Sequence, residues 1–356
     1  MKKPTRNAEP EFVVTMPMGL DGVAASEVAQ RAPGASLLSR TSTELRLRGA
    51  EVGSLAALRS VNDAWVVVRD YRGIGPRYRD LHALKNLVSR TSLDRALALS
   101  QVDGGRRRTT DFALTCSMRG ERAYRRLDAL KACEEGLAAQ SGGRFRPAAT
   151  GAALRLWLHL EEDRARLCVA LTPKPLHLRD RSVSLPTSLS GPVAYAMAHL
   201  TEPRADDVFV DPTCGSGSIA LERGENWRHR QLLLGDRSHQ AVEAAAANFG
   251  PRHKPRSVLW WDAAHLPLGP DSVDALACNP PHGIQMQPEA GLEPLYRGII
   301  GEAARILRAG GRMTFLTPLR EMTDRVLRDV GGFRIERCFV IDLLGQRPYL
   351  YSLRRR

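Results

Sequence analysis

The stretch of the chain with the most suggestive chemistry is Asn279-Pro280-Pro281-His282, which directly follows an apolar run, residues 275–278. The amide oxygen of Asn279 and the carbonyl of Pro280 could accept the two N–H bonds of an exocyclic amino group on a nucleic-acid base. Such an amino group is a poor nucleophile because its lone pair is delocalised into the ring, and two preorganised acceptors would aim that lone pair at an incoming methyl carbon. The prolines stiffen the loop, and the ring of His282 could stack on a flipped base.

The same residues are also good turn formers, so type alone does not decide their role. Their place does, because ligands bind at the carboxyl ends of strands in open α/β sheets. Residues 275–278 are predicted to be the fourth strand of such a sheet, and the loop that follows should face a ligand. We therefore interpret Asn279, Pro280, Pro281 and His282 as catalytic residues.

A cofactor loop is predicted earlier in the chain, where the apolar segment 208–210 is followed by an acid. Glycines there let the backbone approach a ligand closely, and the helix that follows offers free backbone N–H groups. The carboxylate of Asp211 suits a cationic ammonium, such as the amino group of methionine. The loop residues that we expect to bind cofactor are Asp211, Thr213, Cys214, Gly215 and Gly217.

Two further strands, 231–234 and 258–260, are also followed by acids. Asp236 is placed to accept hydrogen bonds from both hydroxyls of a ribose, and Asp262 to meet an adenine amino group. The pattern Gly215-x-Gly217-x-x-Ala220 also fits the dinucleotide fingerprint, so the loop alone leaves NAD open. The Asn-Pro-Pro-His loop favours S-adenosylmethionine, since a dehydrogenase has no use for it. The expected cofactor-binding set also contains Asp236, Arg237, Asp262, Ala263 and Asn279.

The alternation of helical stretches with short apolar strands from residue 191 onward predicts a doubly wound, mostly parallel sheet of the Rossmann type. The strands 339–341 and 349–351 are joined by a short turn and should be antiparallel. The earlier sequence reads as two α+β units, with a helix over 81–99 and a hairpin of strands near 154–160 and 167–171. The expected organisation is a flexible tail (1–10), two α+β domains (11–80 and 81–180), a linker (181–190) and an α/β domain (191–356).

The net charge of +13 is unevenly distributed, with +11 in residues 1–185 and +2 in the remainder. A basic half joined to a nearly neutral half suggests that the first half binds a polyanion. For any single arginine a solvated surface position is the simpler interpretation, whereas the set as a whole favours contact with phosphate. The basic residues that we expect to contact RNA are Arg106, Arg107, Arg108, Arg119, Arg122, Arg125, Arg126, Lys131, Arg144 and Arg146.

Six widely spaced cysteines without a CxxC pair predict reduced thiols and no metal site. The N-terminus lacks the apolar core of a signal peptide, and no run is long enough for a membrane helix. A cytoplasmic protein is therefore expected.

The segments DPTCGSGSIALE (211–222) and NPPHG (279–283) resemble the class I S-adenosylmethionine-dependent RNA methyltransferases that carry an N-terminal THUMP domain. LHLRDRSVSLPTSLSGPVAYAMAHL (176–200) resembles the junction at which their THUMP domain ends. The resemblance implies a ferredoxin-like domain, a THUMP domain and a Rossmann-like catalytic domain. Within the family the chain looks most like the tRNA guanine-N2 (TrmN) branch, which methylates guanosine 6 of the acceptor stem.

That resemblance implies that the first two domains hold the 3′ end of tRNA, and we expect the protein to be a monomer. One departure is His282, since many relatives carry Tyr or Phe there. Three alternatives stay open: a 23S rRNA guanine-N2 methyltransferase, an adenine-N6 methyltransferase acting on RNA or DNA, and an RNA-binding module with an inactive catalytic domain.

Overall fold

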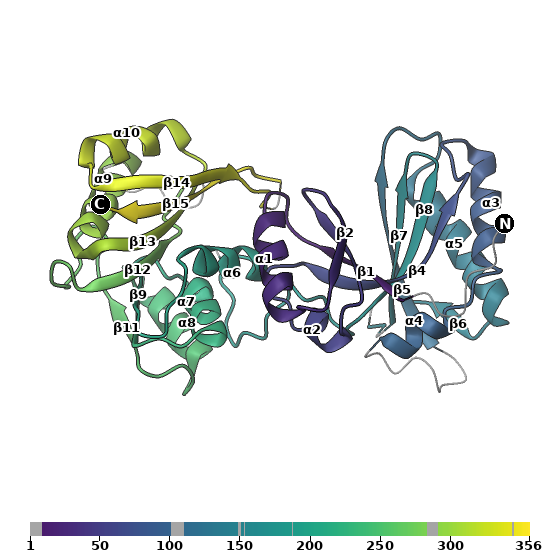
Figure 1. Cartoon of the computed structure of the whole chain (residues 1–356), viewed down its shortest axis with the longest axis horizontal. Coiled ribbons are helices and arrows are strands. Elements are labelled where there is room, and N and C mark those ends of the chain that lie inside the picture. Colours follow the sequence, from purple (N-terminus) through teal and green to yellow (C-terminus); the bar gives the residue numbers. More distant parts are fainter. Residues whose placement is uncertain are drawn as a thin grey trace. The chain divides into compact units, whose positions relative to one another are not determined.

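A computed structural model of the chain describes residues 9–100, 110–148, 151–152, 154–186, 188–282, 291–343 and 345–356 (Figure 1). The chain divides into two compact units. Unit 1 contains Met1–Thr15 and Ala25–Leu176, and unit 2 contains Met16–Ala24 and His177–Arg356. No helix among the described residues is long and apolar enough to cross a membrane.

Unit 1 is built on one eight-stranded sheet in the order β2-β3-β1-β4-β8-β7-β5-β6. Its strands are β1 (Glu11–Thr15), β2 (Ser36–Arg40), β3 (Glu44–Arg48), β4 (Asp63–Arg72), β5 (Thr110–Arg119), β6 (Phe145–Pro147), β7 (Leu154–Glu161) and β8 (Arg164–Ala170). Its helices are α1 (Asp21–Arg31), α2 (Val52–Ala56), α3 (Tyr78–Val88), α4 (Asp94–Leu99) and α5 (Arg126–Ser141). The first residues of α1 are grouped with unit 2.

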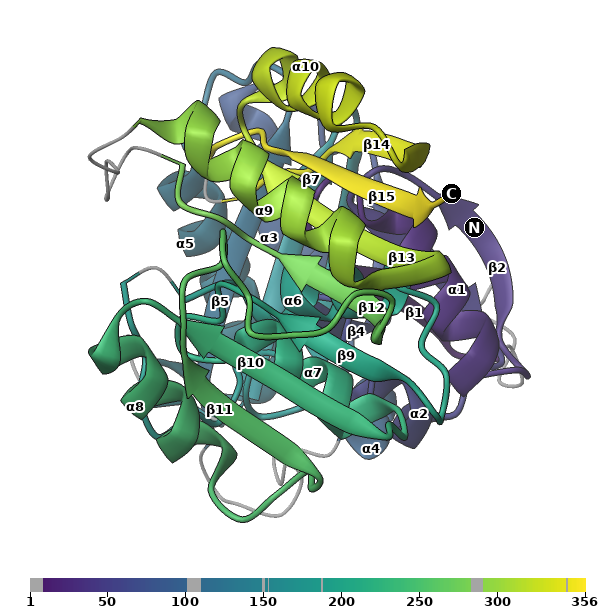
Figure 2. The same ribbon diagram turned by 90° about the vertical axis from the view of Figure 1, so that its left-hand side faces the viewer.

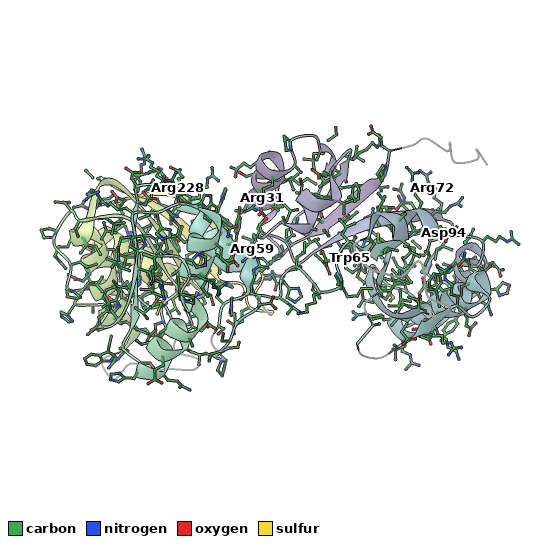
Figure 3. All side chains as sticks on the ribbon, turned by 90° about the horizontal axis from the view of Figure 1, so that it is seen from below. Arg31, Arg59, Trp65, Arg72, Asp94 and Arg228 are labelled. Atoms are coloured by element: carbon green, nitrogen blue, oxygen red, sulfur yellow. The ribbon has the colours of Figure 1, made fainter. Side chains whose placement is uncertain are left out.

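The sheet of unit 1 runs through both of the expected α+β regions, because β4 pairs antiparallel with β8. Trp65 on β4 packs against Trp157 on β7, with ring centroids 5.5 Å apart, and Figure 3 labels Trp65 within this unit. The predicted hairpin is confirmed, since β7 and β8 pair antiparallel with leucines buried on one face. The division of this region into a ferredoxin-like and a THUMP domain stays a prediction.

The prediction of one continuous helix over 81–99 is wrong, because the chain forms two helices there, α3 and α4, with a break between them. In the break, the hydroxyl of Thr91 donates to the carbonyl of Leu87, and the backbone N–H of Asp94 donates to the Ser92 hydroxyl. Such local side-chain bonds to the backbone compete with helix continuation.

Unit 2 contains a seven-stranded sheet in the order β11-β10-β9-β12-β13-β15-β14 (Figure 2). Strands β9 to β13 pair in parallel, whereas β15 pairs antiparallel with both β13 and β14. This confirms the doubly wound sheet and its antiparallel final pair. The strands are β9 (Val208–Asp211), β10 (Gln231–Asp236), β11 (Arg256–Trp260), β12 (Val273–Cys278), β13 (Leu307–Thr317), β14 (Phe333–Val340) and β15 (Tyr349–Arg355).

Helices cover both faces of this sheet. Those of the first face are α6 (Gly191–Leu200), α7 (Ser218–Asn226) and α8 (His239–Phe249), and those of the second are α9 (Leu292–Ile306) and α10 (Arg320–Val330). Alternate residues of β13 show the division, because Met313 and Phe315 pack with α9 while the Thr314 hydroxyl donates to the carbonyl of Met197 on α6.

A short segment near the N-terminus packs within unit 2. The carbonyl of Met18 accepts a hydrogen bond from the backbone N–H of Asp342, at 3.0 Å. Gly19 has a φ of +90°, and a Cβ there would lie only 2.2 Å from the carbonyl oxygen of Val340. This close approach requires glycine. The segment Met16–Ala24 thus belongs to unit 2, although the sequence predicted it to lie in the domain 11–80.

Candidate active site

Four loops of unit 2 meet at one edge of its sheet, because β9 to β12 are parallel and their carboxyl ends coincide. The predicted cofactor loop follows β9, and the predicted catalytic loop follows β12. The Thr213 hydroxyl lies 3.4 Å from the Cys278 sulfur and joins the first loop to the end of β12. The structure therefore brings both predicted motifs to the same edge.

The carboxyl group of Asp211 is fully buried at the end of β9. Neither of its oxygens has a hydrogen bond of normal geometry among the described residues. Burial raises the pKa of Asp211 to about 8, an effect that the neighbouring Asp236 increases and the backbone N–H of Thr213 opposes. A buried carboxyl group that lacks a well-formed hydrogen bond costs folding free energy, and a cationic ligand would relieve that cost.

The loop after Asp211 is held by backbone contacts. The N–H of Cys214 donates to the carbonyl of Gly235 at 2.9 Å, and the N–H of Gly217 donates to the carbonyl of Cys214 at 2.8 Å. Gly215 and Gly217 have φ values of +52° and +84°, and a side chain at Gly215 would meet only open space. The Cys214 thiol points inward and burial raises its pKa, so this residue contributes its backbone rather than a nucleophile.

Asp236 is oriented by two backbone donors. Its Oδ2 accepts from the N–H of Gly215 and its Oδ1 from the N–H of Ser238, both at 3.0 Å. Each carboxylate oxygen can accept further bonds, so a vicinal diol could be held at the same time. Asp236 thus links the cofactor loop to the start of α8, and its side chain is only partly buried.

Asp262 follows the end of β11 by two residues, and its side chain is about half exposed. Its Oδ1 accepts from the N–H of Ala264 at 2.9 Å, and the neighbouring Ala263 is buried. Arg237 is exposed, and its carbonyl accepts from the indole N–H of Trp260 at 2.8 Å.

Sequence reasoning missed the pair formed by Trp260 and His239, whose rings stack 5.0 Å apart at an interplanar angle of 7°. In the sequence, Trp260 looks like an ordinary strand residue. Because β11 is the outermost strand of its sheet, the Trp260 side chain is 62% exposed.

The catalytic loop contains a second buried acceptor, the side-chain oxygen of Asn279, which has no hydrogen-bond partner among the residues that the structure describes. Behind the loop, the hydroxyl of Tyr296 on α9 lies 3.4 Å from the Pro281 carbonyl, 3.5 Å from Nδ1 of His282 and 3.1 Å from the Thr317 hydroxyl. Burial lowers the pKa of His282 to about 4, so its ring is neutral at pH 7. Sequence reasoning also missed Tyr296, because its helical pattern shows a buried face but not the loop packed against it.

The predicted RNA-binding residues that the structure describes fall into three groups. The guanidinium of Arg122 donates to the carbonyls of Ile74, Gly75 and Glu162, so it stabilises unit 1 from within. Arg119 pairs with Glu161 at 3.1 Å, and Arg144 lies over the ring of Phe145. Exposed side chains on α5, its N-terminal flank and β6 are those of Arg125, Arg126, Lys131 and Arg146. Arg106, Arg107 and Arg108 lie outside the described residues.

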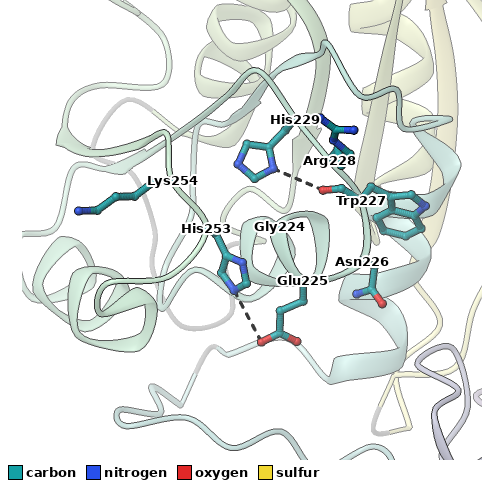
Figure 4. Close-up of a pocket in the computed structure, with 8 residues that line it drawn as sticks. All are labelled: Gly224, Glu225, Asn226, Trp227, Arg228, His229, His253 and Lys254. Carbon is teal, nitrogen blue, oxygen red and sulfur yellow. Dashed lines mark hydrogen bonds and ion pairs between the residues drawn. The ribbon is translucent and has the colours of Figure 1, made fainter.

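A cavity of about 570 Å³ is lined by eight residues of unit 2, which Figure 4 draws as sticks. Its lining residues precede β10 and β11, so it opens at the opposite edge of the sheet from the cofactor loop. Nδ1 of His229 lies 3.4 Å from the carbonyl of Trp227, and burial lowers the pKa of both His229 and His253. Over the described ranges, no three His, Cys, Asp or Glu side chains lie close enough to share a metal ion.

Comparisons with known proteins agree with this geometry. Residues 179–341 match the family described as RMKL-like, methyltransferase domain. The tRNA (guanine(6)-N(2))-methyltransferase THUMP3 of Mus musculus is 29% identical over 260 residues, which cover 68% of this chain and 51% of that protein. The tRNA (guanine(6)-N2)-methyltransferase of Thermus thermophilus is 31% identical over 214 residues, covering 57% of this chain and 61% of that protein.

The chain thus spans about half the length of the mouse relative. Among solved structures, TrmN from Thermus thermophilus superimposes with a TM-score of 0.80 at 24% identity, covering 98% of this chain and all of that one. Residues 179–341 are therefore similar to the RMKL-like methyltransferase domain, and the chain as a whole shares the fold of TrmN.

Proposed function

We propose that the chain transfers a methyl group from S-adenosylmethionine to the exocyclic N2 amino group of a guanosine in tRNA. The observation that carries the proposal is a pair of buried acceptors at one sheet edge, the Asp211 carboxyl group and the Asn279 side-chain oxygen, which lack a well-formed hydrogen bond within the described part of the chain. One suits the ammonium of the cofactor, and the other suits an N–H of the target base. The match to a methyltransferase domain and the names of the relatives support the same reaction.

The residues present fit S-adenosylmethionine, which supplies an electrophilic methyl group. Asp211 would bind its ammonium, and the exposed backbone at Gly215 leaves space for its amino-acid part. Asp236 would hold the ribose hydroxyls, and Asp262 with Ala263 would flank the adenine. Asn279 and the Pro280 carbonyl would orient the amino group of the base, while neutral His282 would stack on its ring.

We expect Asp236→Ala to weaken binding of S-adenosylmethionine by about ten- to a hundredfold, because the ribose hydroxyls lose their charged acceptor. Isothermal calorimetry on the purified protein measures this. Asp329→Ala, which removes an exposed carboxylate paired with Arg297 on the surface, is the matched control. Wild-type affinity in Asp236→Ala would refute the assignment, as would tight NAD binding by the wild type.

For the RNA, we propose that the acceptor stem is the target and that unit 1 binds the 3′ end. The bacterial and mammalian relatives are named for guanine 6 of tRNA, and residues 1–185 carry a net charge of +11. The chain would act as a cytoplasmic monomer without a metal. The substrate class can be tested by comparing methyl incorporation into undermethylated tRNA, 23S rRNA and duplex DNA, and preferred methylation of rRNA or DNA would overturn it.

The exposed cations on α5 and at its N-terminal flank give a prediction for RNA affinity. Replacing Arg125, Arg126 and Lys131 together with alanine should weaken tRNA binding roughly tenfold and reduce the slope of log affinity against log salt by about two to three, because fewer counterions are released. Filter binding over a salt series measures both. The control is Arg328→Ala, an exposed arginine of unit 2. An unchanged slope in the triple variant would place the RNA elsewhere.

A further inference from the structure

Asn248 on α8 connects the cofactor loop to the segment that enters unit 2 from unit 1. We define the junction segment as residues 177–190, of which the structure describes 177–186 and 188–190. The Asn248 side chain is 3% exposed. Its Oδ1 accepts from the N–H of Val183 at 2.9 Å, and its Nδ2 donates to the carbonyls of Val183 at 2.8 Å and of Ser216 at 3.0 Å.

Ser188 makes a second connection between the junction segment and the same loop. Its hydroxyl lies 2.7 Å from the hydroxyl of Ser216 and accepts from the backbone N–H of Leu185 at 2.9 Å. Ser216 is the residue between the two loop glycines, Gly215 and Gly217. Both its carbonyl and its hydroxyl are therefore held from outside the loop.

A third connection joins the junction segment to α7, the helix that follows the cofactor loop. Nε of Arg179 donates to Glu222 on α7 at 2.6 Å, and their side chains are only 9% and 2% exposed. The junction segment thus contacts the loop at Ser216 and the following helix at Glu222. A buried pair of this kind fixes the position of two elements even where its net contribution to stability is small.

These contacts have a consequence for the loop because Gly215 and Gly217 both have positive φ. Glycines give the backbone wide conformational freedom, so a loop that must present its N–H groups in one geometry needs restraint from its surroundings. Asn248 uses both N–H bonds and its oxygen in that restraint. Removing the amide would leave a buried carbonyl of Ser216 and both backbone groups of Val183 without this partner.

We propose that Asn248 and Ser188 are positioning residues for the cofactor loop. The junction segment then contributes to cofactor binding by holding the loop in its binding geometry. The inference rests on the proposed function, because it takes the loop after β9 as the binding site of S-adenosylmethionine. Neither residue touches the cofactor in this proposal. Both act through Ser216.

The test uses the full chain with Asn248→Ala, the milder Ser188→Ala, and Gln231→Ala as a control. Gln231 is a partly buried amide at the opposite edge of the same sheet, bonded to Ser257. By calorimetry, Asn248→Ala should bind S-adenosylmethionine about ten- to a hundredfold more weakly and Ser188→Ala about three- to tenfold more weakly. At saturating cofactor, kcat and the KM for RNA should stay within about threefold of wild type.

Hydrogen exchange without ligand separates this inference from the proposed function. Amides of residues 213–218 should exchange faster in both variants than in wild type or Gln231→Ala. By reciprocity, S-adenosylmethionine should slow exchange in the wild-type junction segment. If the wild type binds no cofactor but the loop still exchanges faster in the variants, the proposed function is refuted. The positioning of the loop by Asn248 and Ser188 is then still supported. A folded Asn248→Ala or Ser188→Ala variant with wild-type cofactor affinity and wild-type loop exchange would contradict the positioning role of that residue.

Discussion

Replacing Asn279 with alanine should lower kcat for methyl transfer by roughly 100- to 1000-fold, the cost of losing one preorganised polar contact at a reacting centre. The buried side-chain oxygen of Asn279 has no partner among the described residues, so it is available to accept an N–H of the target base. The carbonyl of Pro280 would still hold the other N–H. The KM for RNA should therefore change little, which is the pattern of an interaction made mainly in the transition state.

Single-turnover kinetics with saturating cofactor measures this effect directly. His282→Ala should behave differently and raise the KM for RNA, because losing a stacking face costs about 1–3 kcal/mol, whereas His282→Phe should keep most activity. Since burial lowers the pKa of His282 to about 4, its neutral ring should give no inflection in rate between pH 5.5 and 8. Wild-type turnover in Asn279→Ala would defeat the mechanism.

Replacing Asp211 with asparagine should make the ligand-free protein more stable and should weaken cofactor binding by at least a hundredfold. Burial raises the pKa of Asp211 to about 8, whereas an unfolded Asp has a pKa of about 3.9. The folded state therefore holds a proton that the unfolded state releases, and stability falls as the pH rises from about 4 to about 8. Asparagine removes this loss, which amounts to a few kcal/mol at most, but it cannot pair with the ammonium.

Thermal unfolding between pH 5 and pH 8 checks the stability arm. The gain in Tm from Asp211→Asn should be small at pH 5 and should reach several degrees at pH 8. Calorimetry in buffers of different ionisation enthalpy checks the binding arm, because at pH 7 the wild type should release a proton when the cationic cofactor binds. A lower Tm of Asp211→Asn at every pH, or wild-type cofactor binding that releases no proton, would contradict the role assigned to Asp211.

The parts of the site that could be predicted from the sequence are those carried by local patterns. Short apolar strands ending in Asp211, Asp236 and Asn279 identified both the parallel sheet and its ligand-binding edge, since parallel strands share that edge. The hairpin of β7 and β8 was equally legible from alternating leucines and an acidic turn.

The features that could not be predicted depend on contacts between distant residues. The pairing of β4 with β8, which makes one sheet of unit 1, has no local signature. Asn248 reads as one polar residue on an alanine-rich helix, and its three hydrogen bonds are visible only when the junction segment is folded against it. For the same reason Arg122 was grouped with surface cations, although its guanidinium bonds to backbone carbonyls of unit 1.

The central claim is that the site formed by the loops at this sheet edge catalyses methyl transfer to the N2 amino group of guanine. Its most direct test is methyl transfer from isotopically labelled S-adenosylmethionine to undermethylated tRNA, followed by digestion to nucleosides and mass spectrometry. The predicted label is in N2-methylguanosine, with Asn279→Ala forming it at least a hundredfold more slowly. Label in N6-methyladenosine, or in no nucleoside despite measured cofactor binding, would contradict the account.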